Sequence, residues 1–207
     1  MRAEEPGPDQ SPDPVARPGR RTTRIGFDAI VATFVAVLAV AVSAYTAYVQ
    51  RQQVRAQVWP VLEFSTGNVP VLEVTLANKG VGPALIKNVI ITADGVPVTE
   101  WHAVMVQLLG PGDYGFSESD IHDRVFSAGE SKIIFTPAEK DTGQSLKVGP
   151  EGSVGARFNV ARFKIGAEIC YCSTLGDCWT MTVLPHNESS IVETARCPRH
   201  SATSFLQ

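Results

Sequence analysis

The sequence predicts a mainly β domain, either a β-sandwich or a partly open barrel, that follows one N-terminal transmembrane helix. An uncharged, mostly apolar run at 29–49 indicates the helix, and alternating apolar and polar residues after residue 60 indicate strands. The 207 residues include 17 glycines and 14 prolines, a content of turn residues that favours short strands over a helical bundle. We expect one main domain of about 150 residues.

The segment before the helix, 1–28, is expected to be a disordered cytoplasmic tail. Its first 24 residues contain five prolines and no aromatic residue, so they cannot bury enough apolar surface to offset the entropy lost on ordering. Residues 29–49 match the roughly 20 residues that a helix needs to cross the hydrocarbon core. A cleaved signal peptide, the alternative, would have an apolar run of about 7–15 residues behind a shorter leader.

Arginines around this span predict its orientation. Four precede it and two follow it closely, namely Arg17, Arg20, Arg21 and Arg24 against Arg51 and Arg55. Because positive side chains stay on the cytoplasmic side, the N-terminus is expected in the cytoplasm and the main domain, 59–197, outside it. Residues 50–58 lack Gly and Pro and should extend the helix until Pro60 stops it. Residues 198–207 are expected to form a C-terminal tail.

Period-two alternation marks the first strands of the main domain. Residues 71–77 and 84–92 alternate in this way, and turn residues at 78–83 separate them. Asp94-Gly95 predicts a tight hairpin, and Pro97 places the strand after it at a sheet edge. These segments therefore predict antiparallel pairing.

Residues 99–109 break the alternation and predict a short amphipathic helix lying on the sheet. Its apolar residues recur with helical spacing: Trp101, Val104, Met105, Leu108 and Leu109. Thr99 is expected to cap the start, and Gly110 to end it. Beyond it we expect a polar loop at 113–131, a strand at 132–136, a loop at 138–153 and strand structure again from Val154.

Three of the four cysteines fall within Cys170–Cys178, and the parity of two predicted strands places all three on one polar face. With a five-residue loop at 173–177, Cys172 faces Cys178 across a hairpin, and a third strand at 191–197 would bring Cys197 to the same rim. Outside the cytoplasm an even cysteine count indicates disulfides. The preferred pairing is Cys172–Cys178 with Cys170–Cys197, although sequence leaves three connectivities open.

Metal binding by the same four cysteines, Cys170, Cys172, Cys178 and Cys197, is the alternative. Their spacing is not that of zinc knuckles, whose cysteines come in C-x2–4-C pairs. The Cys170-Tyr-Cys172 step resembles the Cys-x-Cys copper ligands of the single-span, immunoglobulin-like copper chaperones of cytochrome oxidase assembly, and thiolates suit Cu(I). A thiol oxidoreductase would be expected to have a C-x-x-C motif at a helix N-terminus, and the sequence lacks this motif. No cofactor or metal is expected.

Other residues with catalytic potential are scattered. No nucleophile elbow, phosphate-binding loop, dinucleotide fingerprint or zinc-protease motif occurs. His102 is expected to cap or pack, the acidic loop 118–123 around His122 to be solvated, and His186 and His200 to be exposed. Asn187-Glu-Ser189 matches a glycosylation sequon. A hydrolase using His122 or His102 would have no identifiable nucleophile, so no catalytic residue is expected.

Two segments carry a resemblance to known proteins. Asn78-Lys-Gly-Val-Gly-Pro-Ala84, between two predicted strands, resembles the early strand pair of immunoglobulin-like adhesion and envelope modules. The span followed by Gln57-Val-Trp-Pro60 is similar to a group of uncharacterised single-pass bacterial inner-membrane proteins. This resemblance implies an immunoglobulin-like β-sandwich outside the cytoplasm, on a bacterial inner membrane, and no activity.

The expected role is therefore non-catalytic: docking or scaffolding of another envelope protein by a membrane-anchored β-domain. Segment 1–55 carries a net charge of +2 and segment 56–207 carries −5, so no basic stripe is available for nucleic acid. A tethered copper- or zinc-handling module is the second hypothesis, and the hydrolase is the third. The sequence names no small-molecule ligand.

Overall fold

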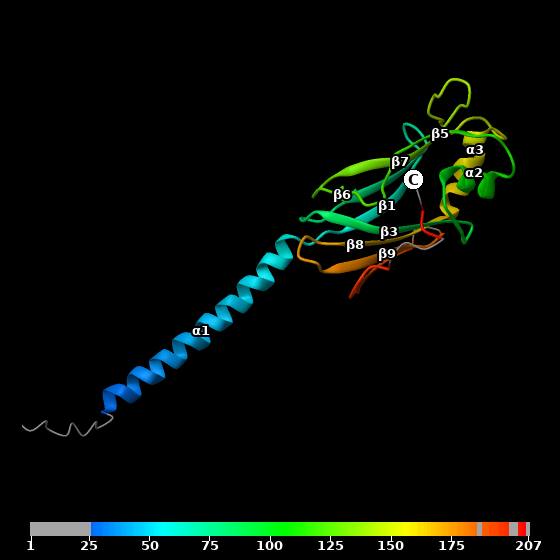
Figure 1. Ribbon diagram of the computed structural model, residues 1–207. Helices are drawn as coiled ribbons and strands as arrows, with labels where there is room; N and C mark the ends of the chain where they lie inside the picture. Colours follow the sequence, from blue (N-terminus) through cyan, green and yellow to red (C-terminus); the bar gives the residue numbers. More distant parts are fainter. Residues whose placement is uncertain (1–25, 186–187, 199–202, 206–207) are drawn as a thin grey trace, which may run out of the picture. The chain divides into compact units, whose positions relative to one another are not determined.

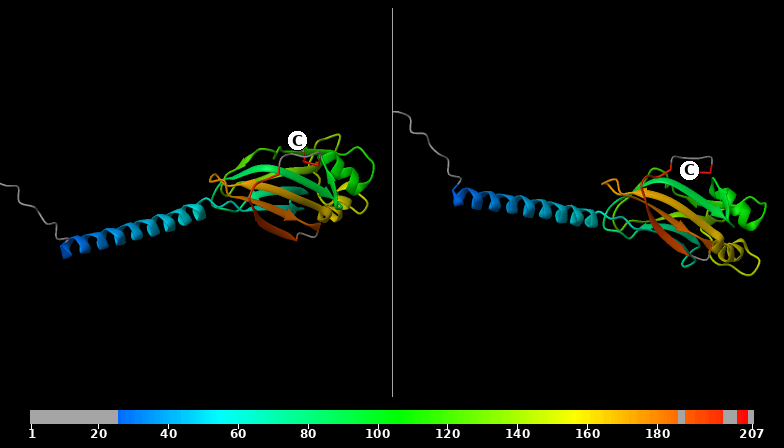
Figure 2. Two further views of the ribbon diagram at one scale, coloured as in Figure 1. Left: turned by 60° about the horizontal axis from the view of Figure 1, so that its bottom comes forward. Right: turned by 90° about the horizontal axis from the view of Figure 1, so that it is seen from below.

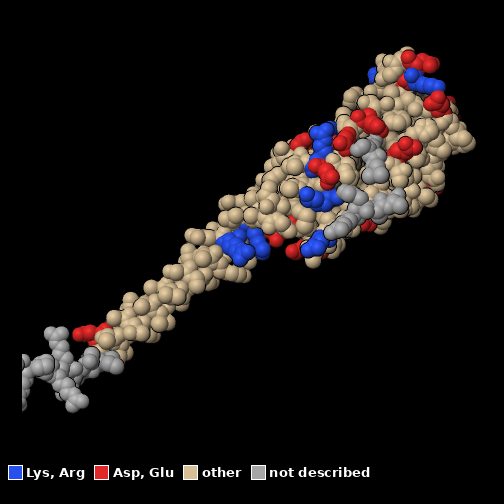
Figure 3. Space-filling model, in the orientation of Figure 1, with Lys and Arg blue, Asp and Glu red and all other residues tan. Residues whose placement is uncertain are grey.

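The computed structural model describes residues 26–185, 188–198 and 203–205. The chain divides into two units, Met1–Tyr48 and Val49–Gln207. Helix α1 (Phe27–Gln57) contains an apolar stretch with a mean hydropathy of 2.3, long and apolar enough to cross a membrane. None of its residues is buried, and charged side chains are confined to its ends, with the basic ones at the C-terminal end (Figure 3).

The second unit is mainly β, with two antiparallel sheets (Figure 1). The first sheet has the order β1-β2-β7-β5: β1 (Leu62–Gly67), β2 (Glu73–Asn78), β7 (Ser131–Ala138) and β5 (Gly115–Glu118). The second has the order β10-β9-β8-β3-β4: β10 (Ser189–Thr194), β9 (Cys178–Val183), β8 (Ile165–Cys172), β3 (Ala84–Ala93) and β4 (Val96–Val98). Strand β6 (Val125–Phe126) also pairs with β3.

The predicted strand pairs are present. The segments at 71–77 and 84–92 correspond to β2 and β3, and Asp94 and Gly95, with φ of 52° and 78°, form the two-residue turn into β4. These positive φ values suit the mirror-image turns that close hairpins. Strand β4, which contains Pro97, lies at the sheet edge as expected.

Both sheets contribute to one hydrophobic core (Figure 2). Val74 and Leu76 of β2 are fully buried, as are Ile91 of β3 and Ile169 of β8. Buried and less buried residues alternate along 73–76 of β2 and 84–87 of β3, as the period of two requires. The largest buried aromatic side chain, Trp101, stacks on Phe135 of β7 with 4.5 Å between ring centroids.

Two helices lie side by side at one end of the sheets: α2 (Trp101–Leu109) and α3 (Val154–Ala161) (Figure 1). Helix α2 was expected, but its N-cap is Glu100, which makes no side-chain capping bond, so the capping role predicted for Thr99 is wrong. The strand predicted from Val154 is also wrong. Ser153 instead accepts a hydrogen bond from the Ala156 N–H and starts a helix, because a hydroxyl there satisfies a free amide.

The loop predicted at 113–131 is wrong in part, because it contains β5 and β6. Both strands are short, and β5 lies at a sheet edge, so neither buries a regular face. The strand predicted at 132–136 is confirmed as the central part of β7.

The chain enters the β-sheets through a tight junction centred on Asn78. The buried Asn78 side chain accepts hydrogen bonds from the N–H groups of Val61 and Gly80 and donates to the Gly82 carbonyl. A Cβ at Gly82 would lie 2.0 Å from the Val58 carbonyl oxygen, so only glycine fits there. The two segments quoted above for their resemblance, at 57–60 and 78–84, are therefore parts of one structural feature.

Within the expected C-terminal tail, 198–207, two of the residues that the structure describes, Ser204 and Phe205, are buried. The Phe205 N–H donates to the Val89 carbonyl at 2.7 Å, and the Ser204 hydroxyl donates to the Asn88 side chain at 2.9 Å. Phe205 is 1% exposed and belongs to the core. Strand β3 pairs with β6 at 84–85 and with β4 at 91–93, and the backbone of Phe205 contacts β3 between these two stretches.

Candidate functional site

Hairpin β8–β9 positions three of the four cysteines. In its antiparallel register Cys172 lies opposite Cys178 and Cys170 opposite Thr180. The loop at 173–177 closes through the Ser173 N–H, which donates to the Asp177 carbonyl at 2.8 Å. The cysteines occupy the face opposite the core, so the predicted hairpin, loop length and parity are all present.

The sulfurs form two disulfides, Cys172–Cys178 and Cys170–Cys197, and no cysteine is free. This is the pairing that the sequence analysis preferred. Strand β10 brings Cys197 to the site by pairing with β9, with Thr194 opposite Cys178. The predicted return strand at 191–197 therefore exists, but it begins and ends earlier.

The two disulfides are in contact. The Sγ of Cys172 lies 3.8 Å from the Sγ of Cys197, and the sulfurs of Cys172, Cys178 and Cys197 all lie within 4.8 Å of one another. While both bonds are intact, none of these sulfurs is a thiolate ligand. The arrangement can hold a thiophilic metal ion only after reduction, whereas thiol–disulfide exchange needs a single free thiolate.

A cavity of about 620 Å³ opens onto this cluster. Three of the four cysteines line it together with basic, acidic and small residues: Lys87, Asp123, Cys172, Gly176, Cys178, Ala195, Arg196, Cys197 and Pro198. Cys170 is not among them and is 2% exposed. Two cations, Lys87 and Arg196, thus line the same cavity as Cys172, Cys178 and Cys197.

Aromatic residues and an ion pair surround the same end of the hairpin. Trp179 lies between Trp59 and Tyr171, with ring centroids 6.5 and 6.0 Å away. The Arg55 guanidinium lies 3.5 Å from the Asp177 carboxylate of the loop. Burial raises the pKa of Tyr171, and the nearby Leu62 backbone opposes this in smaller part.

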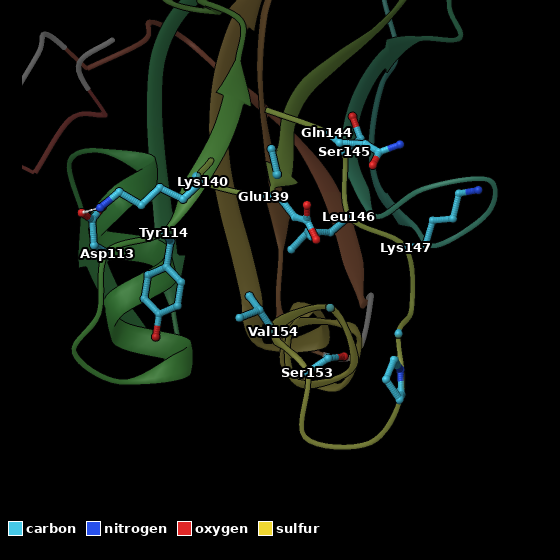
Figure 4. Close-up of a pocket in the computed structure, with 15 residues that line it drawn as sticks. Asp113, Tyr114, Glu139, Lys140, Gln144, Ser145, Leu146, Lys147, Ser153 and Val154 are labelled. Carbon is cyan, nitrogen blue, oxygen red and sulfur yellow. Dashed lines mark hydrogen bonds and ion pairs between the residues drawn. The ribbon is translucent and has the colours of Figure 1, made fainter. Parts of the chain in front are cut away.

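A second cavity, of about 600 Å³, lies beside the start of α3 (Figure 4). Asp113 and Lys140 form an ion pair at its rim, and the lysine lowers the pKa of the Asp113 carboxyl through a hydrogen bond and charge attraction. Ser153 points into this region, but its oxygen already caps α3. The lining contains no histidine or cysteine.

Of the histidines that the sequence singled out, His102 and His122 do not line the cavity at the cysteines. His102 lies half-buried on α2. The Nδ1 of His122 lies 3.6 Å from the Asp123 carboxylate, in the exposed acidic loop. His186, His200 and Asn187 lie outside the described residues.

Sequence analysis missed Lys87 and Arg196 at the cysteine site. Lys87 falls where the register between β3 and β8 shifts, opposite the stretch that carries Cys170 and Cys172. Such a bulge redirects a side chain but leaves no local sequence signal. Arg196 directly precedes Cys197 in the sequence, and this adjacency could have indicated that its side chain lies near the cysteines.

Comparison of the chain with protein-family models, with curated proteins and with solved structures finds no match.

Proposed function

We propose that the chain is a single-pass protein of a bacterial inner membrane whose immunoglobulin-like β-domain docks another envelope protein outside the cytoplasm, without catalysing a reaction. The length and hydropathy of α1 support the anchor. The arginines before it favour a cytoplasmic N-terminus. Two disulfides suit an oxidising compartment, and two antiparallel sheets around one core suit the immunoglobulin-like class.

The exposure of β10 is the observation that supports the docking role. Five of its six residues are exposed, including Ile191 at 41% and Val192 at 62%. Among the described residues β10 pairs only with β9, so its other edge offers unpaired backbone N–H and C=O groups. Such an edge accepts an extended segment of a partner as an additional strand. The partner segment would place apolar side chains beside Ile191 and Val192.

Site-specific photo-crosslinking in intact membranes tests this role. The full chain carries a photoreactive amino acid at Val192, and a matched chain carries it at Val160 of α3, which is 74% exposed. We expect one discrete protein adduct from position 192 and none from position 160. With the photoreactive amino acid moved to Ser190, the same adduct should form, and Val192→Lys should abolish it, because a charged edge opposes strand addition. Equal adducts from positions 160 and 192 would contradict docking at β10.

A further inference from the structure

We infer that the cysteine rim is a thiol–disulfide exchange centre, in which Cys172 attacks Cys197 after a dithiol reductant has opened the Cys172–Cys178 bond. This activity is independent of the docking role proposed above. It rests on the contact between the two disulfides, on the cavity that exposes them unequally and on the groups around each sulfur.

Access decides which sulfurs react first. The Cys172–Cys178 bond has both of its residues in the wall of the cavity, whereas Cys170–Cys197 offers only Cys197 there. Cys172 and Cys178 are 9% and 7% exposed, so a dithiol reaches them through the cavity, where it meets both residues of this bond but only one residue of the other. That step reduces one disulfide to two thiols and oxidises the dithiol to a disulfide, so two electrons and two protons are transferred.

The second step is an intramolecular exchange with no net redox change. The Cys172 thiolate, with its sulfur 3.8 Å from Cys197, forms the Cys172–Cys197 bond and releases Cys170 as a thiolate. The Thr180 hydroxyl donates to the Cys170 sulfur at 3.5 Å, so the leaving sulfur already has a hydrogen-bond donor. A proton moves from solvent or from the Cys178 thiol to the Cys170 thiolate. Cys197 is disulfide-bonded before and after the step, first to Cys170 and then to Cys172.

The charged residues of the cavity lining are two cations, Lys87 and Arg196, and one carboxylate, Asp123, so its net charge favours a thiolate. Lys87 extends from a register shift in β3, at the level of the β8 cysteines, and lines the cavity with Cys172. A positive charge near a thiol lowers its pKa and raises the thiolate fraction at neutral pH. Lys87 is thus a positioning residue, which acts on the rate through the charge state of Cys172.

Limited reduction of the wild-type full chain in detergent tests the exchange. The protein receives one equivalent of dithiothreitol, acid stops the reaction, and thiols are alkylated under denaturing conditions. Chymotrypsin cleaves after Tyr171 and separates Cys170 from Cys172 for mass spectrometry. We expect a two-electron-reduced form with a Cys172–Cys197 bond and with Cys170 and Cys178 alkylated. Only the native Cys170–Cys197 bond in that form would overturn the inference.

Two matched serine variants isolate the attacking sulfur. Cys178→Ser leaves Cys172 as a permanent thiol, and it should show Cys172–Cys197 and Cys170–Cys197 bonds together without any reductant. Cys172→Ser should retain Cys170–Cys197. An equal amount of Cys178–Cys197 bond in Cys172→Ser would show that Cys172 has no special role.

The Lys87 contribution has its own readout. Lys87→Gln should slow the exchange about threefold at pH 7 and leave it unchanged near pH 10, where the thiol is ionised without help. Lys147→Gln, at an exposed lysine of the other cavity, is the control and should match the wild type. A pH-independent effect of Lys87→Gln would exclude the charge mechanism.

Discussion

The ring of Phe205 meets the ring of Trp101 edge-on, with 5.1 Å between their centroids. One residue comes from the C-terminal segment and the other from the first turn of α2, so the end of the chain completes the core between α2 and β3. The contact explains why Trp101 is fully buried although it opens a short helix.

Phe205→Ala should lower the free energy of unfolding by about 3–5 kcal/mol, because it removes a buried aromatic ring and leaves a cavity beside Trp101. Urea unfolding of the full chain in detergent, followed by tryptophan fluorescence, measures the change. Val160→Ala, at a side chain 74% exposed, is the control and should stay within about 0.5 kcal/mol of the wild type. Equal stability of the two variants would mean that Phe205 is not part of the core.

Local patterns predicted the features that depend on one or two neighbouring strands. The alternation in 71–77 and 84–92 predicted β2 and β3, because one face of each strand is buried and the side-chain period is two. The same parity placed Cys170, Cys172 and Cys178 on one face, and the five-residue loop placed Cys172 opposite Cys178, which made their pairing the preferred one among three. These inferences needed no knowledge of distant contacts.

The features that were missed depend on distant parts of the chain. Helix α3 contains Gly155, Asn159 and two valines, which are poor helix formers, so its only clear signal was the cap at Ser153. Phe205 looks like a tail residue until the Val89 carbonyl of β3, which accepts a hydrogen bond from its N–H, is known. Register shifts such as the one at Lys87 arise from sheet twist and pairing, which a single strand does not reveal.

Gly82→Ala should destabilise the junction between α1 and the β-sheets by about 1–3 kcal/mol, the usual cost of overpacking. Its Cβ would lie 2.0 Å from the Val58 carbonyl oxygen, a backbone atom that cannot rotate away. Gly67→Ala is the matched control, because its Cβ would meet only the Glu73 side chain, at 3.1 Å. Urea unfolding of both variants measures the difference, and a neutral Gly82→Ala would show that the junction is loosely packed.

Tyr171→Phe should reduce the loss of stability at alkaline pH. Burial raises the pKa of Tyr171 above the ordinary value of about 10, so the folded chain holds the phenolic proton more tightly than the unfolded chain. The resulting stabilisation is fully present below about pH 10 and is lost as the pH rises through the folded pKa. The variant has no such proton, so its free energy of unfolding should fall less between about pH 9 and 11.

At neutral pH the same change should cost little, within about 1 kcal/mol, because the buried Tyr171 hydroxyl makes no hydrogen bond of good geometry. Tyr114→Phe is the contrast, since the Tyr114 hydroxyl donates to the Gly110 carbonyl at 3.0 Å and its loss should cost about 0.5–1.5 kcal/mol. A large loss for Tyr171→Phe at neutral pH would reveal a hydrogen bond to the Leu62 backbone.

The orientation proposed for α1 depends on a small difference in flanking charge, so it should be sensitive to that charge. Alkaline phosphatase fused after Pro60 should be active in a bacterial host, because this enzyme needs the oxidising side of the membrane to form its own disulfides. Replacing Arg17, Arg20, Arg21 and Arg24 with Gln leaves Arg51 and Arg55 as the only flanking arginines near the span and should lower that activity strongly. A matched variant with Arg51 and Arg55 replaced should keep it. If the fusion is inactive in the unaltered chain and a cytoplasmic reporter at the same position is active, the β-domain faces the cytoplasm and the disulfides need another explanation.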